Sequence, residues 1–116
     1  MSVPQLTEPA FFVLTSLVDQ PRHGYGIVGS VLDLSSGKVR LKIGTLYGVL
    51  ERLAAEGLLE PDREEVASGR FRRYYRLTDD GRGALEAAAE RQALNAAVAT
   101  ARLRAHPVGP SRPAFS

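Results

Sequence analysis

The stretch Ile43-Gly44-Thr45-Leu46-Tyr47-Gly48-Val49-Leu50-Glu51-Arg52-Leu53 decides the fold of this chain. At 100° per residue its larger apolar side chains gather on one side, which predicts an amphipathic helix over residues 43–56. Gly57 follows this helix as its expected C-cap. The outward side carries Thr45, Gly48 and Arg52.

A strongly basic stretch lies shortly after this helix. Residues 58–65 and 70–77 predict two strands, joined by a loop around Ala67-Ser68-Gly69. The second strand carries four arginines with aromatic residues among them and contains no acid. The major groove of DNA accepts an α-helix, and arginines contact phosphates, so this helix and hairpin together favour binding to duplex DNA.

Three more helices complete the pattern outside this central region. Apolar spacing predicts one over residues 7–19 and a second from Tyr25 to Leu34, with a break between them at residues 20–24. Thr78 is the expected N-cap of a last helix over residues 79–104. The fold class is therefore mainly α with a small β-hairpin, a winged helix-turn-helix plus a long C-terminal helix. We expect the DNA-binding domain at 1–77, a dimerisation helix at 78–104 and a disordered tail at 105–116.

The last helix is too long to be covered by one small domain. At 1.5 Å per residue it extends about 40 Å, whereas a compact chain of this size has a radius of gyration near 13 Å. Two opposed apolar stripes follow its length, which favours a second copy of the chain as partner. Alternatively, alanine-rich helices are simply stable and tolerate small exposed side chains.

Composition excludes several classes of function. The 116 residues support one domain, and the absence of cysteine excludes disulfides and thiolate chemistry. With two histidines, one of them in the predicted tail, the chain lacks a catalytic cluster, so we expect no enzyme activity, cofactor or metal site. No apolar run is long enough to cross a membrane, and we expect a cytoplasmic protein.

Charge is unevenly distributed, although the formal net charge is only +2. One acid-free stretch holds Lys38, Arg40 and Lys42, and a second holds the arginines of residues 70–76. Acids gather nearby at residues 60–65. Localised positive charge indicates a surface that meets a polyanion, although a solvated basic loop gives the same pattern.

Four motifs, in this order and spacing, resemble the PadR family of bacterial transcriptional regulators over residues 9–85. They are Pro21-Arg22-His23-Gly24-Tyr25-Gly26-Ile27, Gly44-Thr45-Leu46-Tyr47, Leu50-Glu51-Arg52-Leu53 with Glu56-Gly57-Leu58-Leu59, and Arg73-Tyr74-Tyr75-Arg76-Leu77-Thr78-Asp79-Asp80-Gly81. The single terminal helix is similar to the short branch of that family. The resemblance implies a homodimeric repressor that dimerises through its first and last helices and releases DNA on binding a small molecule.

Two positions depart from the family pattern. Lys42 stands where a small hydroxyl residue usually caps the third helix, and a lost cap costs about 1 kcal/mol. Gly48 replaces the usual proline and costs about 1 kcal/mol relative to alanine inside a helix. Lys42 recovers its loss if it meets a phosphate, and Gly48 lets the helix approach DNA closely.

The expected DNA contacts divide into positioning and reading. Positioning through phosphates is assigned to Lys38, Arg40, Lys42, Arg70, Arg72 and Arg73. Reading is assigned to Thr45 and Arg52 on the third helix, with Tyr47 at its border and Gly48 on its outward face. Arg52 has an alternative partner in Glu56 at the i+4 position, and Tyr47 has the alternative of core packing alone. His23 and Tyr25 are expected to organise the start of the second helix.

The resemblance places dimerisation on the first and last helices, and there we assign Phe11, Leu14, Leu85, Leu94, Val98 and Ala101. A two-fold dimer presents two reading helices and predicts a palindromic operator in double-stranded DNA. The competing hypothesis is a winged-helix module that contacts another protein without binding DNA. That module would show no salt-dependent affinity for DNA.

Overall fold

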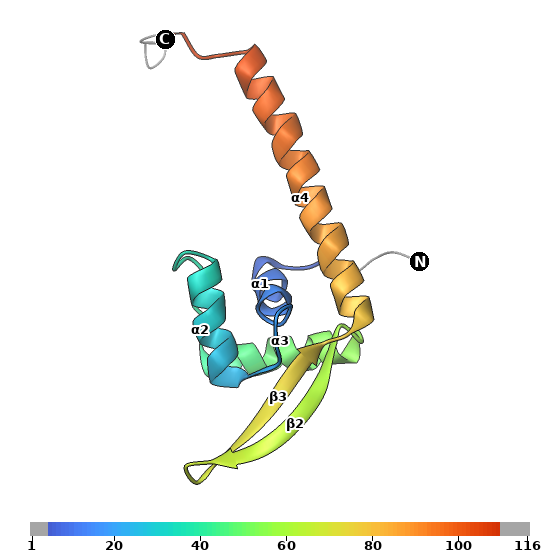
Figure 1. Ribbon diagram of the computed structural model, residues 1–116. Helices are drawn as coiled ribbons and strands as arrows, with labels where there is room; N and C mark the ends of the chain where they lie inside the picture. The colour runs from blue at the N-terminus through green and yellow to red at the C-terminus, as the bar shows by residue number, and fades with distance from the viewer. Residues whose placement is uncertain (1–4, 110–116) are drawn as a thin grey trace.

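The computed structural model describes residues 5–109, in which it places four helices and a three-stranded antiparallel sheet. The predicted winged helix-turn-helix with a long last helix is confirmed (Figure 1). The elements in chain order are α1 (Glu8–Ser16), β1 (Arg22–His23), α2 (Gly24–Leu34), α3 (Ile43–Ala55), β2 (Leu59–Ala67), β3 (Arg70–Leu77) and α4 (Asp79–Ala105).

Strand β1 is an element that the sequence analysis did not predict. Its two residues lie in the expected break between the first two helices and pair antiparallel with Tyr75 and Tyr74 of β3. The strand order is therefore β1-β3-β2. The hairpin of β2 and β3 is the wing of this fold. The pairing with β1 attaches the base of the wing to the start of α2.

Helix α1 ends earlier than predicted, at Ser16 instead of Asp19. It begins after Thr7, whose hydroxyl accepts a hydrogen bond from the Ala10 amide at 3.2 Å. At the other end the Arg22 Nε donates to the Ser16 carbonyl oxygen at 2.7 Å. A carbonyl that the helix leaves unpaired is thus satisfied by β1, which fixes where the helix stops.

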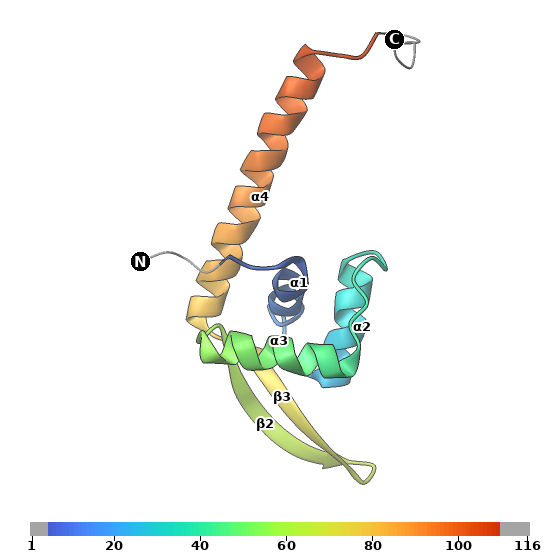
Figure 2. The ribbon, with the colours of Figure 1, turned by 180° about the vertical axis from the view of Figure 1, so that it is seen from behind.

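The core lies where three helices meet. Figures 1 and 2 both show α1 between α2 and α4, with α3 running across beneath them and the wing extending away from the free end of α4. Apolar residues from α1, α2, α3 and the start of β2 fill the interior. The fully buried side chains include Val13, Leu14, Ile27, Val31, Leu46, Leu53 and Leu59.

The base of α4 fits tightly against the wing and the end of α3. Thr78 accepts a hydrogen bond from the Gly81 amide at 2.9 Å and donates its hydroxyl to the Gly57 carbonyl oxygen at 2.6 Å. A Cβ atom on Gly81 would fall far inside van der Waals contact with the carbonyl oxygen of Leu58. Only glycine therefore fits here without a shift of the backbone. Ala84 and Ala88 continue this buried face of α4.

Beyond this base, α4 projects from the domain, as predicted. Residues 89–105 are exposed, and the molecule measures 64 × 34 × 22 Å with a radius of gyration of 18.7 Å. Ala105, assigned to the tail, is the last residue of the helix, and His106 follows as its C-cap. Residues 107–109 have no regular structure, and the rest of the predicted tail, 110–116, lies outside the described residues.

Candidate nucleic-acid interface

The outward face of α3 forms an exposed ridge of four residues, Gly44, Thr45, Gly48 and Arg52. Thr45, Gly48 and Arg52 are exposed there, as predicted from the helical spacing, and Gly44 lies beside them. Nothing lies within 4 Å of a Cβ built on Gly44 or Gly48, and neither has a positive φ. Glycine is unfavourable inside a helix. Neither packing nor backbone conformation explains these two glycines, and the same holds for Gly29 of α2 and Gly83 of α4. The pair on α3 differs in lying beside the exposed Thr45 and Arg52.

Arg52 has no intramolecular carboxylate partner in residues 5–109. The alternative of a pair with Glu56 fails, because no ion pair within 4.0 Å joins Arg52 to any described acid. Since Arg52 is exposed, its five N–H groups remain available to a ligand on this ridge.

Tyr47 lies at the border of the ridge, with 50% of its surface exposed. Its hydroxyl oxygen would be 3.1 Å from a Cβ atom on Gly24, the first residue of α2. The ring therefore packs between the starts of α2 and α3 while its other side faces solvent. Both alternatives raised for Tyr47, packing and contact with a ligand, fit this position.

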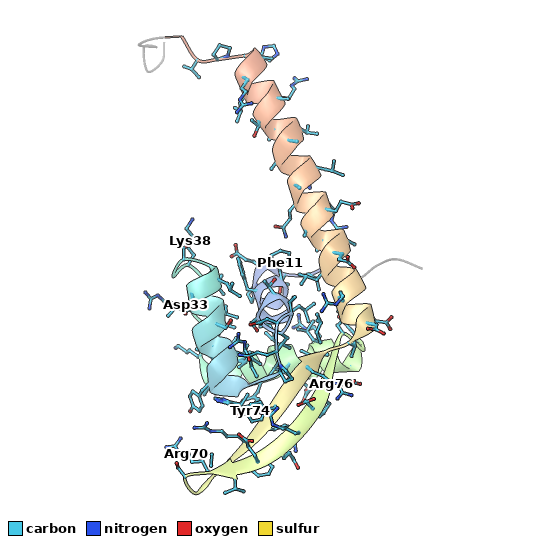
Figure 3. All side chains as sticks on the ribbon, in the orientation of Figure 1. Phe11, Asp33, Lys38, Arg70, Tyr74 and Arg76 are labelled. Carbon is cyan, nitrogen blue, oxygen red and sulfur yellow. The ribbon has the colours of Figure 1, made fainter. Side chains whose placement is uncertain are left out.

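The three cations before α3 do not form one patch. Lys42 is the N-cap residue of α3 and makes no side-chain capping hydrogen bond, in agreement with its departure from the family pattern. Lys38 lies at the far end of α2, away from the wing (Figure 3). Lys38, Arg40 and Lys42 are all exposed, but only Lys42 is at the start of the reading helix.

The wing is a hairpin with a two-residue turn, and from this turn to Glu64 its two strands pair without interruption. Ser68 and Gly69 form its turn, with φ of 53° and 74°, the conformation that matches the twist of paired strands. Strand β2 continues to Ala67, two residues beyond the predicted Glu65. Successive residues of β3 therefore point alternately toward α3 and away from it.

The side of the wing that faces α3 borders an open groove of about 440 Å³. Tyr47, Leu50 and Glu51 of α3 line one wall, and Phe71, Arg73 and Tyr75 of β3 line the other. A smaller hollow of about 90 Å³ lies next to it, where Tyr25 and Tyr47 approach Arg70 and Arg72. The wing and the starts of α2 and α3 thus converge on one surface.

The arginines of the wing differ in their partners. Arg73 donates to the carboxylate of Glu64 through Nε at 3.1 Å and Nη2 at 3.0 Å. Arg76 pairs with Glu60 at 2.7 Å and with Asp62 at 3.2 Å. Within residues 5–109, Arg70 and Arg72 have no carboxylate within 4.0 Å. The basic run and the acidic run, which look separate in the sequence, are therefore partly neutralised against each other.

The other face of the wing packs on the start of α2. The hydroxyl of Tyr74 donates to Glu65 at 2.7 Å, and the Tyr74 ring meets the His23 ring edge-on at 5.2 Å. His23 caps α2, as predicted, because its Nδ1 accepts from the Gly26 amide at 3.2 Å. Burial, together with nearby Arg72, lowers the pKa of His23, and the hydrogen bond from Tyr74 lowers the pKa of Glu65.

The residues assigned to dimerisation occupy three different environments. Leu94, Val98 and Ala101 are exposed on the projecting part of α4, with 62% and 66% of the first two side chains accessible. Phe11 and Leu85 are half-buried near the base. Leu14 is fully buried in the protomer core, so it offers no surface to another chain.

Neither a metal site nor a membrane-spanning helix is found within residues 5–109. No group of three or more histidine, aspartate or glutamate side chains there is placed to hold a metal ion. No helix in that part of the chain combines the length and the apolar character needed to cross a membrane.

Comparison with known proteins identifies similar sequences over the same region. The model of the "Transcriptional regulator PadR-like family" matches residues 13–87. The "Transcriptional regulator Rv3488" of Mycobacterium tuberculosis is 41% identical over 73 residues, which are 63% of this chain and 64% of that protein. This chain therefore covers slightly less than two thirds of that relative's length.

Solved structures share the fold. A PadR family transcription regulator from Clostridium difficile R20291 superposes with a TM-score of 0.71 at 24% identity, covering 84% of this chain and 99% of that one. Bacillus subtilis PadR in complex with operator DNA has a TM-score of 0.58 at 23% identity, covering 66% of this chain and 44% of that one.

Proposed function

This chain belongs to the PadR-like family of transcriptional regulators, and from that membership we propose that it is a homodimeric, sequence-specific DNA-binding repressor. Members of this family are regulators of transcription and not enzymes. We further propose that it acts in the cytoplasm and that a small molecule releases it from DNA.

The observation that carries the proposal is the outward ridge of α3. Gly44 and Gly48 occupy helical positions where alanine would be more stable, and no atom of the described chain fills the space beside them. A helix without side chains on this side can approach the floor of the major groove closely. Thr45 and Arg52 lie on the same ridge, where arginine can pair with guanine and threonine can meet a base or a phosphate.

Cations at the edge of this ridge supply phosphate contacts. Lys42 stands at the start of α3, and Arg70 and Arg72 of the wing have no described carboxylate partner. Their long side chains reach backbone oxygens without requiring a particular sequence. Arg40 and Lys38 take a lesser part, because Lys38 lies at the end of α2 far from the wing (Figure 3).

The second copy of the chain would cover the projecting part of α4. Leu94, Val98 and Ala101 lie there without a partner in the described chain. Two copies related by a two-fold axis bring two α3 helices to one side, spaced by about one turn of DNA. A palindromic operator in double-stranded DNA follows from that symmetry.

A gel shift tests DNA binding directly. The probe is a duplex from the promoter beside the protein's own coding sequence, at two salt concentrations. We expect binding that weakens as salt rises, with a slope of log affinity of about 0.9 for each phosphate neutralised. The alternative, a winged-helix module that contacts a protein through the same ridge, predicts no salt-dependent shift and would replace the proposal if none is seen.

Dimerisation is tested by substitutions on the free part of α4. Leu94→Asp and Val98→Asp place a charge on the proposed contact, so we expect a monomer mass by light scattering and DNA binding weaker by at least about ten-fold. Asn95→Asp adds the same charge at a neighbouring exposed position and serves as the control. Lost DNA binding with an unchanged mass would contradict the dimer.

A further inference from the structure

The register of the wing places acids of β2 directly opposite arginines of β3. The Cα partners are Glu64 with Arg73, Glu65 with Arg72 and Glu60 with Arg76. Opposite residues of antiparallel strands have side chains on the same face and within reach of each other. The acidic strand is therefore paired by the fold with the strand that carries the cations.

The pair between Glu64 and Arg73 is the one nearest the candidate DNA surface. Two guanidinium N–H groups, Nε and Nη2, share the same carboxylate oxygen at 3.1 and 3.0 Å. Arg73 also lines the groove between α3 and the wing. A cation on the wall that faces the reading helix is thus already occupied by an intramolecular anion.

Charge counting shows how much of the wing is neutralised. Residues 59–77 contain five arginines and four acids, a net charge of +1, whereas β3 alone carries +4. Phosphate contacts dominate non-specific affinity for DNA. The wing as folded therefore attracts a DNA backbone far less than β3 by itself would.

Stability is a weak reason for this arrangement. About half of each side chain in the pair is exposed, 53% for Arg73 and 49% for Glu64, and exposed ion pairs contribute little to stability. A carboxylate and a DNA phosphate compete for the same guanidinium N–H groups, because both are anions that accept hydrogen bonds from arginine. The presence of Glu64 thus matters more for what Arg73 binds than for whether the hairpin folds.

We propose that Glu64 tunes the affinity for DNA: it holds Arg73 away from DNA phosphates and so weakens binding to DNA of every sequence alike. This inference rests on the DNA-binding function proposed above. The base contacts of α3 are untouched by Glu64, and a phosphate contact contributes alike on any sequence, so the ratio of specific to non-specific affinity should stay unchanged.

The test measures binding of the full chain to two fluorescent duplexes by anisotropy over a series of salt concentrations. One duplex has a random sequence and the other is the promoter beside the protein's own gene. For Glu64→Gln we expect about five- to ten-fold tighter binding to the random duplex near 0.1 M salt. The salt slope should steepen by about 0.9, the contribution of one phosphate, and binding to the promoter duplex should tighten by the same factor.

Two further variants separate this effect from a change in total charge. Glu86→Gln removes the same charge from an exposed position on α4 and should leave both affinities nearly unchanged. Glu64→Gln combined with Arg73→Ala should lose the gain, because the freed cation is gone. Equal melting temperatures would show that the variants share the native fold.

The outcomes distinguish this inference from the function on which it rests. Wild-type binding with a Glu64→Gln variant that matches Glu86→Gln in affinity and slope would overturn the role of Glu64 alone. A gain that persists without Arg73 would also overturn it. If no variant binds either duplex at low salt, the DNA-binding proposal fails first, and the role of Glu64 fails with it.

Discussion

Two regions of this molecule use glycine for opposite reasons. At the base of α4, Gly81 is buried and a Cβ atom there would collide with the backbone of Leu58. On the outward ridge of α3, Gly44 and Gly48 face open space. Contacts within the chain explain the glycine of the first region, whereas no atom of residues 5–109 fills the space beside the glycines of the second. Gly29 and Gly83 also face open space, so it is the exposed Thr45 and Arg52 beside Gly44 and Gly48 that favour a partner at this ridge.

A substitution at Gly81, in the first region, should cost the most stability. Gly81→Ala forces the backbone at Leu58 to move, so we expect a loss of about 3 kcal/mol in the free energy of unfolding. Gly83→Ala, two residues along the same helix and in open space, should instead gain up to about 1 kcal/mol. Urea denaturation of the two variants measures the difference. Equal stabilities would show that Gly81 is not held by packing.

The next prediction concerns Arg70 and Arg72, the wing arginines with no carboxylate within 4.0 Å in residues 5–109. Arg70→Ala combined with Arg72→Ala should lower affinity for all sequences alike and shallow the salt slope by about 1.8, which is two phosphates. Arg76→Ala, a wing arginine already paired with Glu60 and Asp62, should change the slope far less. Anisotropy titrations over a salt series make the comparison. Similar slopes for the two variants would contradict the division between paired and unpaired arginines.

A substitution at Gly48, in the second region, should have a smaller effect, and its effects on stability and on DNA binding should have opposite signs. Gly48→Ala should stabilise the fold by up to about 1 kcal/mol, since the added methyl group meets nothing. The same methyl should weaken binding to the promoter duplex about ten-fold, or about 1.4 kcal/mol, because it separates α3 from the DNA. Gly29→Ala on α2, also in open space, is matched in stability but should bind normally. Unimpaired binding by Gly48→Ala would remove the argument for close approach.

The smallest effect is a dependence of stability on pH that comes from His23. Burial lowers its pKa in the folded protein below the ordinary value of 6.5, so the unfolded chain binds the proton more readily. Stability should therefore fall as the pH drops from about 6.5 through the lowered pKa, with loss of the Nδ1 cap on Gly26. In His23→Asn, which keeps a capping side chain, this pH dependence should flatten. Thermal melts across pH 5–8 measure it, and identical profiles would contradict the role of His23.

Sequence reasoning predicted the elements whose signals repeat over several turns. The apolar spacing gave α2 and α3 within a residue of their observed ends, and Thr78 marked the start of α4. Strand β1 was not predicted, because two residues are too few to show any periodicity. The buried face of α4 was not predicted, because its residues, Gly81, Ala84 and Ala88, are small. Small residues give little hydrophobic signal in a sequence even where they pack closely.

The pairing of charges in the wing was predictable in part. A two-residue turn at Ser68-Gly69 fixes the register of the strands, and that register sets Glu64 opposite Arg73. The predicted strands left a loop two residues too long, so the register remained undetermined. The bulge between Pro61 and Glu64, which lets Asp62 reach Arg76, had no comparable signal in the sequence.

The hydroxyl of Thr78 joins the carbonyl of Gly57 after α3 to the amide of Gly81 in α4. With Gly81 seated against Leu58, this joint makes α4 a rigid lever pivoted at its base. A lever about 40 Å long that tilts by about 5° moves its tip by about 3.5 Å. By the same geometry, we expect a displacement of a few ångströms at the tip to correspond to a rotation of a few degrees at the base, next to the end of α3.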